Sequence, residues 1–186
     1  GKIIDVAVIQ PNIHLSQKWK PGGIRSNIAS LLDISEPTLK KGLDLVIWPE
    51  SATSTHILQG SQYYLKWIQS KLGDLSLLSG TPYFISNKQE NRLVYNSAVL
   101  ISADSVSRPY HKLQLVPMAE YIPLSDLFPS LKKLNFGQAN FTHGEEFIQF
   151  SIDNTKIAVM ICFESTFPAL SREFVRQGAE ILVFIV

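Results

Sequence analysis

The segment Leu43-Asp-Leu-Val-Ile-Trp-Pro-Glu50 decides the class of fold. Its short apolar run is typical of a strand buried on both faces, and Pro49 ends that strand. Glu50 therefore lies at the carboxyl end of a buried strand, where open α/β sheets bind their ligands. Apolar residues at helical spacing predict a helix over residues 62–72, and a further strand is predicted over residues 75–80. This strand–helix–strand order predicts an α/β protein.

The pattern continues on both sides of this segment. Toward the N-terminus we expect a buried strand at residues 3–9 and a helix from Gly23 to about residue 41, which Pro37 should kink or restart. A long proline-containing loop is predicted over residues 109–144, with one helical turn near residues 125–131. The sheet is predicted to be mixed, with helices on its outer face. The other expected elements are strands at 83–86, 93–101, 147–152, 155–161 and 181–186 and a helix at 167–177.

Composition limits the possible functions. The chain has 186 residues, 45% of them hydrophobic and 18% charged, which predicts one globular domain with a sizeable core. A formal charge of +1 provides no field that would attract nucleic acid. The residues contain neither an apolar stretch long enough to span a bilayer nor the layout of a signal peptide. Because the sequence stops inside the apolar run at residues 181–186, we expect it to be an incomplete domain.

The single cysteine, Cys162, is the first candidate for chemistry. It follows the apolar strand at residues 157–161 and precedes a predicted helix, whose N-terminal partial charge could favour a thiolate. A lone cysteine is also often an inert buried side chain, so its position alone leaves both interpretations open.

Two further residues occupy similar positions at apparent strand ends. Glu50 could act as the base that removes the thiol proton, or it could be a solvated loop residue or a helix cap. Lys112 could stabilise a developing oxyanion, or it could be a surface lysine beside His111. No histidine has a partner at metal-ligand spacing, so we expect neither a metal nor another cofactor.

Glu, Lys and Cys in this order resemble the triad of the nitrilase, or carbon-nitrogen hydrolase, superfamily. Within that superfamily the sequence motifs are similar to those of the apolipoprotein N-acyltransferase family, and the resemblance covers the whole chain. The matching segments are Trp48-Pro-Glu-Ser51, His111-Lys-Leu-Gln-Leu-Val-Pro117 with Glu120-Tyr-Ile-Pro123, Ile161-Cys-Phe-Glu-Ser-Thr-Phe-Pro168, and Gln10-Pro-Asn-Ile13 running to Lys18-Trp19.

The resemblance implies a nitrilase-like αββα sandwich over residues 1–186, truncated at its C-terminal end and lacking the family's membrane-spanning segments. It implies transfer of a fatty acyl group from a phospholipid, through a thioester on Cys162, to the N-terminal amine of a diacylglyceryl-cysteine apolipoprotein. Glu50 would be the general base and Lys112 the oxyanion stabiliser, with Glu120 as an additional catalytic carboxylate. The domain would face the periplasm at the bacterial inner membrane. Supporting positions carried over from the family are Trp19, Phe163 and Glu164.

Three positions depart from the family pattern: Met118 and Ala119 stand for an aromatic residue and a glycine, and Phe163 stands for a tyrosine. The main alternative function is a soluble amidase or nitrilase that uses the same triad with water as the acyl acceptor. A catalytically silent module that only binds a partner is the third hypothesis, and the intact triad argues against it.

Overall fold

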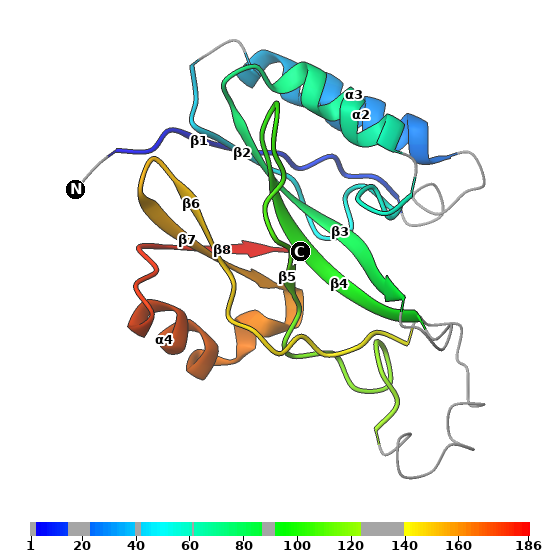
Figure 1. Ribbon diagram of the computed structural model, residues 1–186, viewed down its shortest axis with the longest axis vertical. Helices are drawn as coiled ribbons and strands as arrows, with labels where there is room; N and C mark the ends of the chain where they lie inside the picture. The colour runs from blue at the N-terminus through cyan, green and yellow to red at the C-terminus, as the bar shows by residue number, and fades with distance from the viewer. Residues whose placement is uncertain (1–2, 15–22, 40–41, 61, 87–91, 124–139) are drawn as a thin grey trace.

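The computed structural model describes residues 3–14, 23–39, 42–60, 62–86, 92–123 and 140–186. Two separate sheets dominate it (Figure 1). The five-stranded sheet has the order β1-β2-β3-β4-β5, in which the first two pairings are parallel and the last two antiparallel. Its strands are β1 (Val6–Val8), β2 (Leu45–Ile47), β3 (Ser76–Ser86), β4 (Arg92–Ile101) and β5 (Tyr110–His111).

The second sheet has the order β6-β7-β8, in which β6 and β7 are antiparallel and β7 and β8 parallel. Helices α2 and α3 lie on the outer face of the five-stranded sheet, and α4 lies beyond the three-stranded sheet on the opposite side of the molecule (Figure 1). The layers are therefore helix, sheet, sheet, helix, and the predicted αββα sandwich with mixed sheets is confirmed. The bounds of these elements are β6 (Gln149–Ile152), β7 (Thr155–Ile161), β8 (Ile181–Ile185), α2 (Gly23–Leu39), α3 (Gln62–Leu72) and α4 (Pro168–Arg176).

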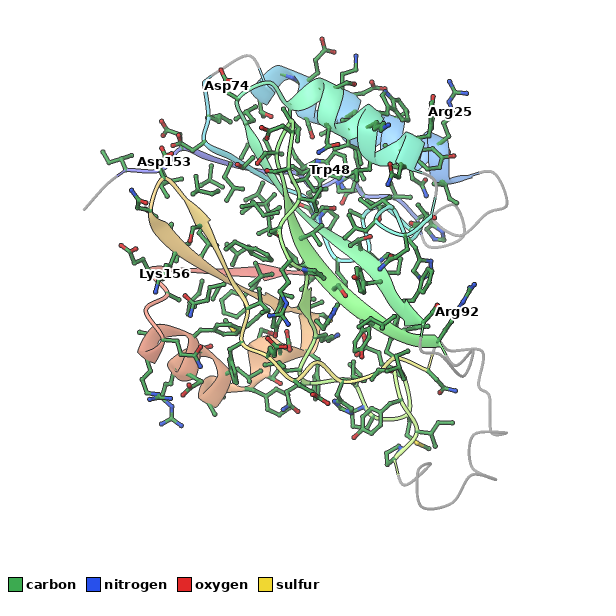
Figure 2. All side chains as sticks on the ribbon, in the orientation of Figure 1. Arg25, Trp48, Asp74, Arg92, Asp153 and Lys156 are labelled. Atoms are coloured by element: carbon green, nitrogen blue, oxygen red, sulfur yellow. The ribbon has the colours of Figure 1, made fainter. Side chains whose placement is uncertain are left out.

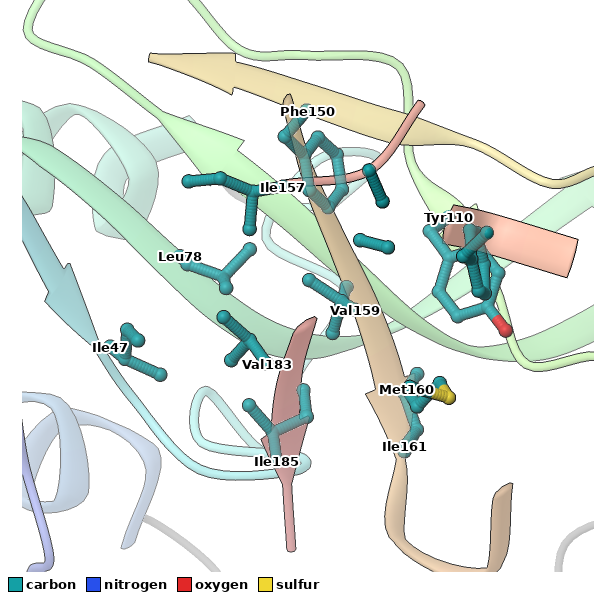
Figure 3. Packing of buried hydrophobic residues seen from close by; sticks show 14 of the residues in the cluster. Ile47, Leu78, Tyr110, Phe150, Ile157, Val159, Met160, Ile161, Val183 and Ile185 are labelled. Atoms are coloured by element: carbon teal, nitrogen blue, oxygen red, sulfur yellow. The ribbon is translucent and has the colours of Figure 1, made fainter. Parts of the chain in front are cut away.

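Apolar side chains from the two sheets meet in the middle of the sandwich. Figure 3 shows Ile47 and Leu78 of the larger sheet near Val183 and Ile185 of the smaller sheet, all of them buried. Burial of apolar surface contributes roughly 25 cal/mol per Å² and is the main force that holds the two sheets face to face.

A second core fills the space between the larger sheet and helices α2 and α3. Trp48 lies there, 1% exposed, in the interior of the molecule (Figure 2). Its indole Nε1 donates a hydrogen bond to the Ser35 hydroxyl of α2 at 3.0 Å. This bond satisfies the only polar atom of the indole, so the residue two positions before Glu50 is fixed by both packing and polarity.

Three elements differ from the sequence-based expectation. The first strand is not buried, because β1 has a single neighbour in the sheet and Val8 is 74% exposed. Helix α2 includes Pro37 and ends at Leu39, so the helix is not restarted at the proline, which removes one backbone N–H donor close to the helix end. The strands expected at 75–80 and 83–86 are one strand, β3, because its antiparallel ladder with β4 is unbroken from Leu77 to Ser86.

Two turns of the structure use left-handed backbone conformations. Asp153 and Asn154 have φ values of 47° and 69°, as a tight hairpin turn requires, and Gly178 after α4 has φ of 99°. The helical turn expected near residues 125–131 lies outside the described residues. Among the described helices, none combines the length and apolar character needed to cross a bilayer.

Gly80 of β3 allows the turn after β2 to approach the sheet. A Cβ atom built on Gly80 would lie 2.6 Å from the Ser51 nitrogen, 2.7 Å from the Glu50 Cα and 2.7 Å from the Pro49 oxygen. All three are backbone atoms, so they cannot move aside as the end of a flexible side chain would. A side chain at position 80 would therefore displace the turn that carries Glu50.

We expect Gly80→Ala to lower the free energy of unfolding by about 1–3 kcal/mol, as overpacking usually does, and to change the near-UV circular dichroism of neighbouring Trp48. Gly73→Ala is the control for the contact itself: its φ of 57° makes an alanine costly there as well, but the added Cβ would meet no atom within 4 Å, so the near-UV signal of Trp48 should stay unchanged. Urea denaturation followed by both signals checks this prediction. An unaltered near-UV spectrum of Gly80→Ala would contradict it.

Candidate active site

Glu50 lies in the turn that follows β2, and this turn packs closely against β3. Trp48 and Pro49 follow β2, and Gly80 lies directly behind the turn. The Glu50 backbone nitrogen donates to the Val186 carbonyl at 3.3 Å, just beyond β8 of the other sheet. The carboxylate therefore lies where the ends of the two sheets meet, and its side chain is 20% exposed.

Lys112 follows β5 and has a fully buried side chain, with 0% exposure. Its backbone is fixed on both sides, because its nitrogen donates to the Asn96 carbonyl and its carbonyl accepts from the Gly144 nitrogen, each at 2.8 Å. Its ammonium Nζ lies 2.8 Å from Glu120 Oε1 and 3.5 Å from Glu50 Oε1. A buried ammonium must be compensated by anionic partners, and these two carboxylates provide that compensation.

Glu120 belongs to a tight turn that begins at Val116. Its carboxylate Oε2 accepts a hydrogen bond from the Val116 backbone nitrogen at 2.9 Å, while Oε1 faces Lys112. Glu120 thus joins its own turn to the ammonium. The structure brings Glu50, Lys112 and Glu120 together, as the sequence-based hypothesis requires.

Cys162 begins a short 3-10 helix, η2 (Cys162–Thr166), immediately after β7. Burial is the main reason that the pKa of its thiol is raised, and the charge of Glu50 raises it further. Lys112 and a hydrogen bond from the Phe163 backbone N–H lower the pKa, but they do not reverse the balance. The resting thiol is therefore more firmly protonated than a free cysteine, and the helix terminus expected to favour the thiolate does not outweigh burial.

Backbone strain accompanies three of these segments. Cys162 has φ of 49°, Ser51 beside Glu50 has φ of 49°, and Met118 in the Glu120 turn has φ of 64°. Such left-handed conformations cost about 1–3 kcal/mol in residues other than glycine and are concentrated at functional sites. The surrounding packing and hydrogen bonds must hold these strained turns in place.

Glu164 has a different position from the other acidic residues. Its side chain is completely buried and makes four hydrogen bonds as an acceptor, all from groups that flank the site. The Tyr110 hydroxyl, the backbone nitrogens of residues 113 and 114, and the Ile161 nitrogen donate to it at 2.8, 2.6, 3.1 and 2.7 Å. Burial raises the pKa of Glu164, and these donors act against that rise. Glu164 therefore ties the segment after Lys112 to the strand that ends immediately before Cys162.

The remaining sequence-based candidates have less definite positions. Phe163 is half-buried, and its ring contacts Phe167 edge to face with the centroids 5.1 Å apart. Trp19 lies outside the described residues. Within the described part of the chain, no group of three or more His, Cys, Asp or Glu residues is arranged to hold a metal ion.

Two residues that contact the site were missed by the sequence reasoning. Asn96 of β4 donates from Nδ2 to Glu50 Oε1 at 2.6 Å and to Glu120 Oε1 at 3.1 Å. The signal that could have identified it is a fully polar amide inside the apolar run Leu93-Val-Tyr-Asn-Ser-Ala-Val-Leu100. Gly80 left no such signal, because its role depends on a contact between distant segments.

This geometry can support acyl transfer. It combines a thiol, a carboxylate able to take the thiol proton, and an ammonium and a backbone N–H able to stabilise an oxyanion. An ordered second carboxylate, Glu120, fixes the ammonium.

Comparison with known proteins gives the same assignment of fold and family. The profile of the carbon-nitrogen hydrolase family matches residues 5–186. The chain is 35% identical over 191 residues to apolipoprotein N-acyltransferase from Geobacter metallireducens, covering 100% of this chain and 36% of that protein. It is 28% identical to the protein of the same name from Chlorobaculum tepidum, covering 98% of this chain and 39% of the relative. The chain thus spans little more than a third of the length of these relatives.

Solved structures share the fold at lower identity. A carbon-nitrogen hydrolase from Helicobacter pylori aligns with a TM-score of 0.68 and 19% identity, over 97% of this chain and 59% of the other. An amidase from Nesterenkonia aligns with a TM-score of 0.64 and 18% identity, over 97% of this chain and 64% of the other. Since the family profile covers nearly all of the sequence, this chain belongs to the carbon-nitrogen hydrolase family.

Proposed function

We propose that this chain is the catalytic part of an apolipoprotein N-acyltransferase, which moves a fatty acyl group from a phospholipid to a lipoprotein amine. The observation that carries the proposal is the buried Lys112 ammonium between Glu50 and Glu120, in a charged cluster that acts on the Cys162 thiol. The names of the curated relatives support the choice of acyl donor and acceptor.

In the first half-reaction, Glu50 takes the proton of Cys162 as the sulfur attacks the ester carbonyl of the phospholipid. The Lys112 ammonium and the Phe163 backbone N–H stabilise the oxyanion of the tetrahedral intermediate. The carbon–oxygen bond then breaks, Glu50 returns its proton to the departing alcohol, and a lysophospholipid leaves. The acyl group remains on Cys162 as a thioester.

In the second half-reaction, the N-terminal amine of a diacylglyceryl-cysteine lipoprotein attacks the thioester carbonyl. Glu50 accepts a proton from the attacking nitrogen, the carbon–sulfur bond breaks, and that proton returns to the sulfur. The products are an amide and a free Cys162 thiol. Glu120 orients Lys112 throughout, and Glu164 holds the Lys112 segment against the cysteine strand.

The surroundings of the site suit a lipid substrate. Met118, in the Glu120 turn, is 52% exposed and presents an apolar, flexible side chain. As the family resemblance of the sequence motifs implies, we place the domain on the periplasmic side of a bacterial inner membrane as part of this proposal. Attachment to the membrane would come from segments outside residues 1–186.

The acyl-enzyme is the direct test of this proposal. We expect the complete protein, incubated with a phosphatidylethanolamine of defined chains, to gain one fatty acyl mass on the peptide containing Cys162. Hydroxylamine should remove that mass, because it cleaves thioesters, and Cys162→Ala should gain none. Turnover of small amides without any lipid adduct would replace the transferase with an amidase that uses the same triad.

The charges around the thiol give a second prediction. Because Glu50 raises the pKa of Cys162, Glu50→Gln should lower it and increase the thiolate fraction near neutral pH. We expect alkylation of Cys162 by iodoacetamide to become faster, by up to about tenfold if the pKa of the thiol falls by about one unit. The rate of acyl transfer should fall by a factor of about 10² to 10⁴, because the general base is lost.

Lys112→Met is the opposed variant, since Lys112 lowers the pKa of Cys162 and its loss should slow alkylation at the same pH. Mass spectrometry of the Cys162 peptide over a range of pH measures both rates. Slower alkylation in Glu50→Gln than in the unmodified protein would contradict the charge arrangement described here.

A further inference from the structure

Asn96 lies at the centre of the charged cluster, although its own side chain carries no charge. It is located in the middle of β4 and is 3% exposed. Its Nδ2 group donates to Glu50 Oε1 and Glu120 Oε1, the same two oxygens that the Lys112 ammonium contacts. Two donors, one neutral and one cationic, therefore bridge a single pair of carboxylate oxygens.

The orientation of the Asn96 amide follows from these partners. Two ionised carboxylates can only accept hydrogen bonds, so the NH₂ group must face them and the oxygen must face away. The Asn96 Oδ1 atom is then buried without a hydrogen-bond partner among the described residues. An unsatisfied buried acceptor lowers the stability of the folded state. The hydrogen bonds from the Asn96 amide to the two carboxylates must offset this loss.

The contact of a neutral amide with Glu50 depends less on the charge of Glu50 than the contact of the Lys112 ammonium does. In the proposed mechanism Glu50 gains and loses a proton in each half-reaction, and the charge attraction that dominates its contact with the Lys112 ammonium is lost whenever it is protonated. A carboxylic acid still has a carbonyl oxygen that can accept a hydrogen bond. The Asn96 amide can therefore hold Glu50 in both protonation states, while the ammonium is directed to the oxyanion.

We propose that Asn96 is a positioning residue that ties Glu50 to Glu120 through both amide hydrogens and keeps Glu50 in register with Cys162 during both half-reactions. This inference rests on the proposed acyl transfer for its kinetic consequences. Its structural consequence, the fixed position of Glu50, does not depend on the identity of the substrate.

The kinetic test measures the rate of thioester formation on Cys162 in the complete protein with phosphatidylethanolamine. Asn96→Ala should lower kcat about 10²-fold and leave the KM for phospholipid within about threefold, because the amide positions the base and does not contact the lipid. Ser97→Ala is the matched control. Ser97 is a buried polar neighbour on the same strand whose hydroxyl bonds with His111 Nδ1 at 2.8 Å, and we expect an unchanged rate.

Asn96→Asp separates positioning from a merely structural role. It has nearly the shape of asparagine but places a third carboxylate beside Glu50 and Glu120, and only its protonated form offers a donor. The ratio of its rate to that of the unmodified protein should therefore rise as the pH is lowered from about 8 to about 5. Asn96→Ala, which has no donor at any pH, should show a constant ratio. Equal pH profiles for the two variants would overturn the proposal.

A crystal structure of Asn96→Ala tests the inference independently of any substrate. The Glu50 carboxylate should leave its position near Lys112 and Glu120, while the Lys112–Glu120 pair remains. An unmoved Glu50 would overturn the proposal. If the unmodified protein forms no acyl adduct but Glu50 moves in this variant, the acyl-transfer proposal fails and the positioning role of Asn96 stands.

Discussion

The burial of the Lys112 ammonium is the constraint on which the site depends. A charge removed from water is tolerated only where anionic partners replace its hydration. Those partners come from the turn after β2 and from the turn that begins at Val116, two segments far from each other in the sequence. The fold has to bring these two turns close together. Compensation of the Lys112 charge therefore couples the position of the turn after β2 to that of the turn that begins at Val116.

A fully buried carboxylate, that of Glu164, fixes the other side of the same loop. Glu164 has no cationic partner among its hydrogen bonds and is satisfied by three backbone N–H groups and the Tyr110 hydroxyl. Backbone donors are held by the fold and do not exchange protons with a carboxylate in the way an acid or a base does. Glu120 therefore anchors the loop through charge, Glu164 anchors it through fixed dipoles, and Lys112 is held between them.

Much of this arrangement could be predicted from the sequence, because short apolar runs indicate where the buried strands end. Glu50 and Cys162 each follow a short apolar run, and the carboxyl ends of strands are where α/β sheets bind their ligands. That β2 and β7 belong to different sheets, whose ends meet, could not be predicted from these runs. Asn96 escaped the same reasoning, since a polar residue inside an apolar strand does not reveal which distant groups it meets. The exposure of β1 was also hidden, because a β-branched run looks the same at the edge of a sheet as at its centre.

In the proposed mechanism, the raised pKa of the Cys162 thiol is the reason that a base is required. Enzymes that keep a resting thiolate pair it with a cation, and they accept the susceptibility to oxidation that comes with a thiolate. Here burial and the Glu50 charge oppose ionisation more strongly than Lys112 favours it. Under the proposed mechanism, the nucleophile is generated only when a proton acceptor of fixed position removes the thiol proton. This dependence gives the position of the Glu50 carboxylate its importance and links the turn backed by Gly80, the Asn96 amide and the Lys112 ammonium to the same chemical step.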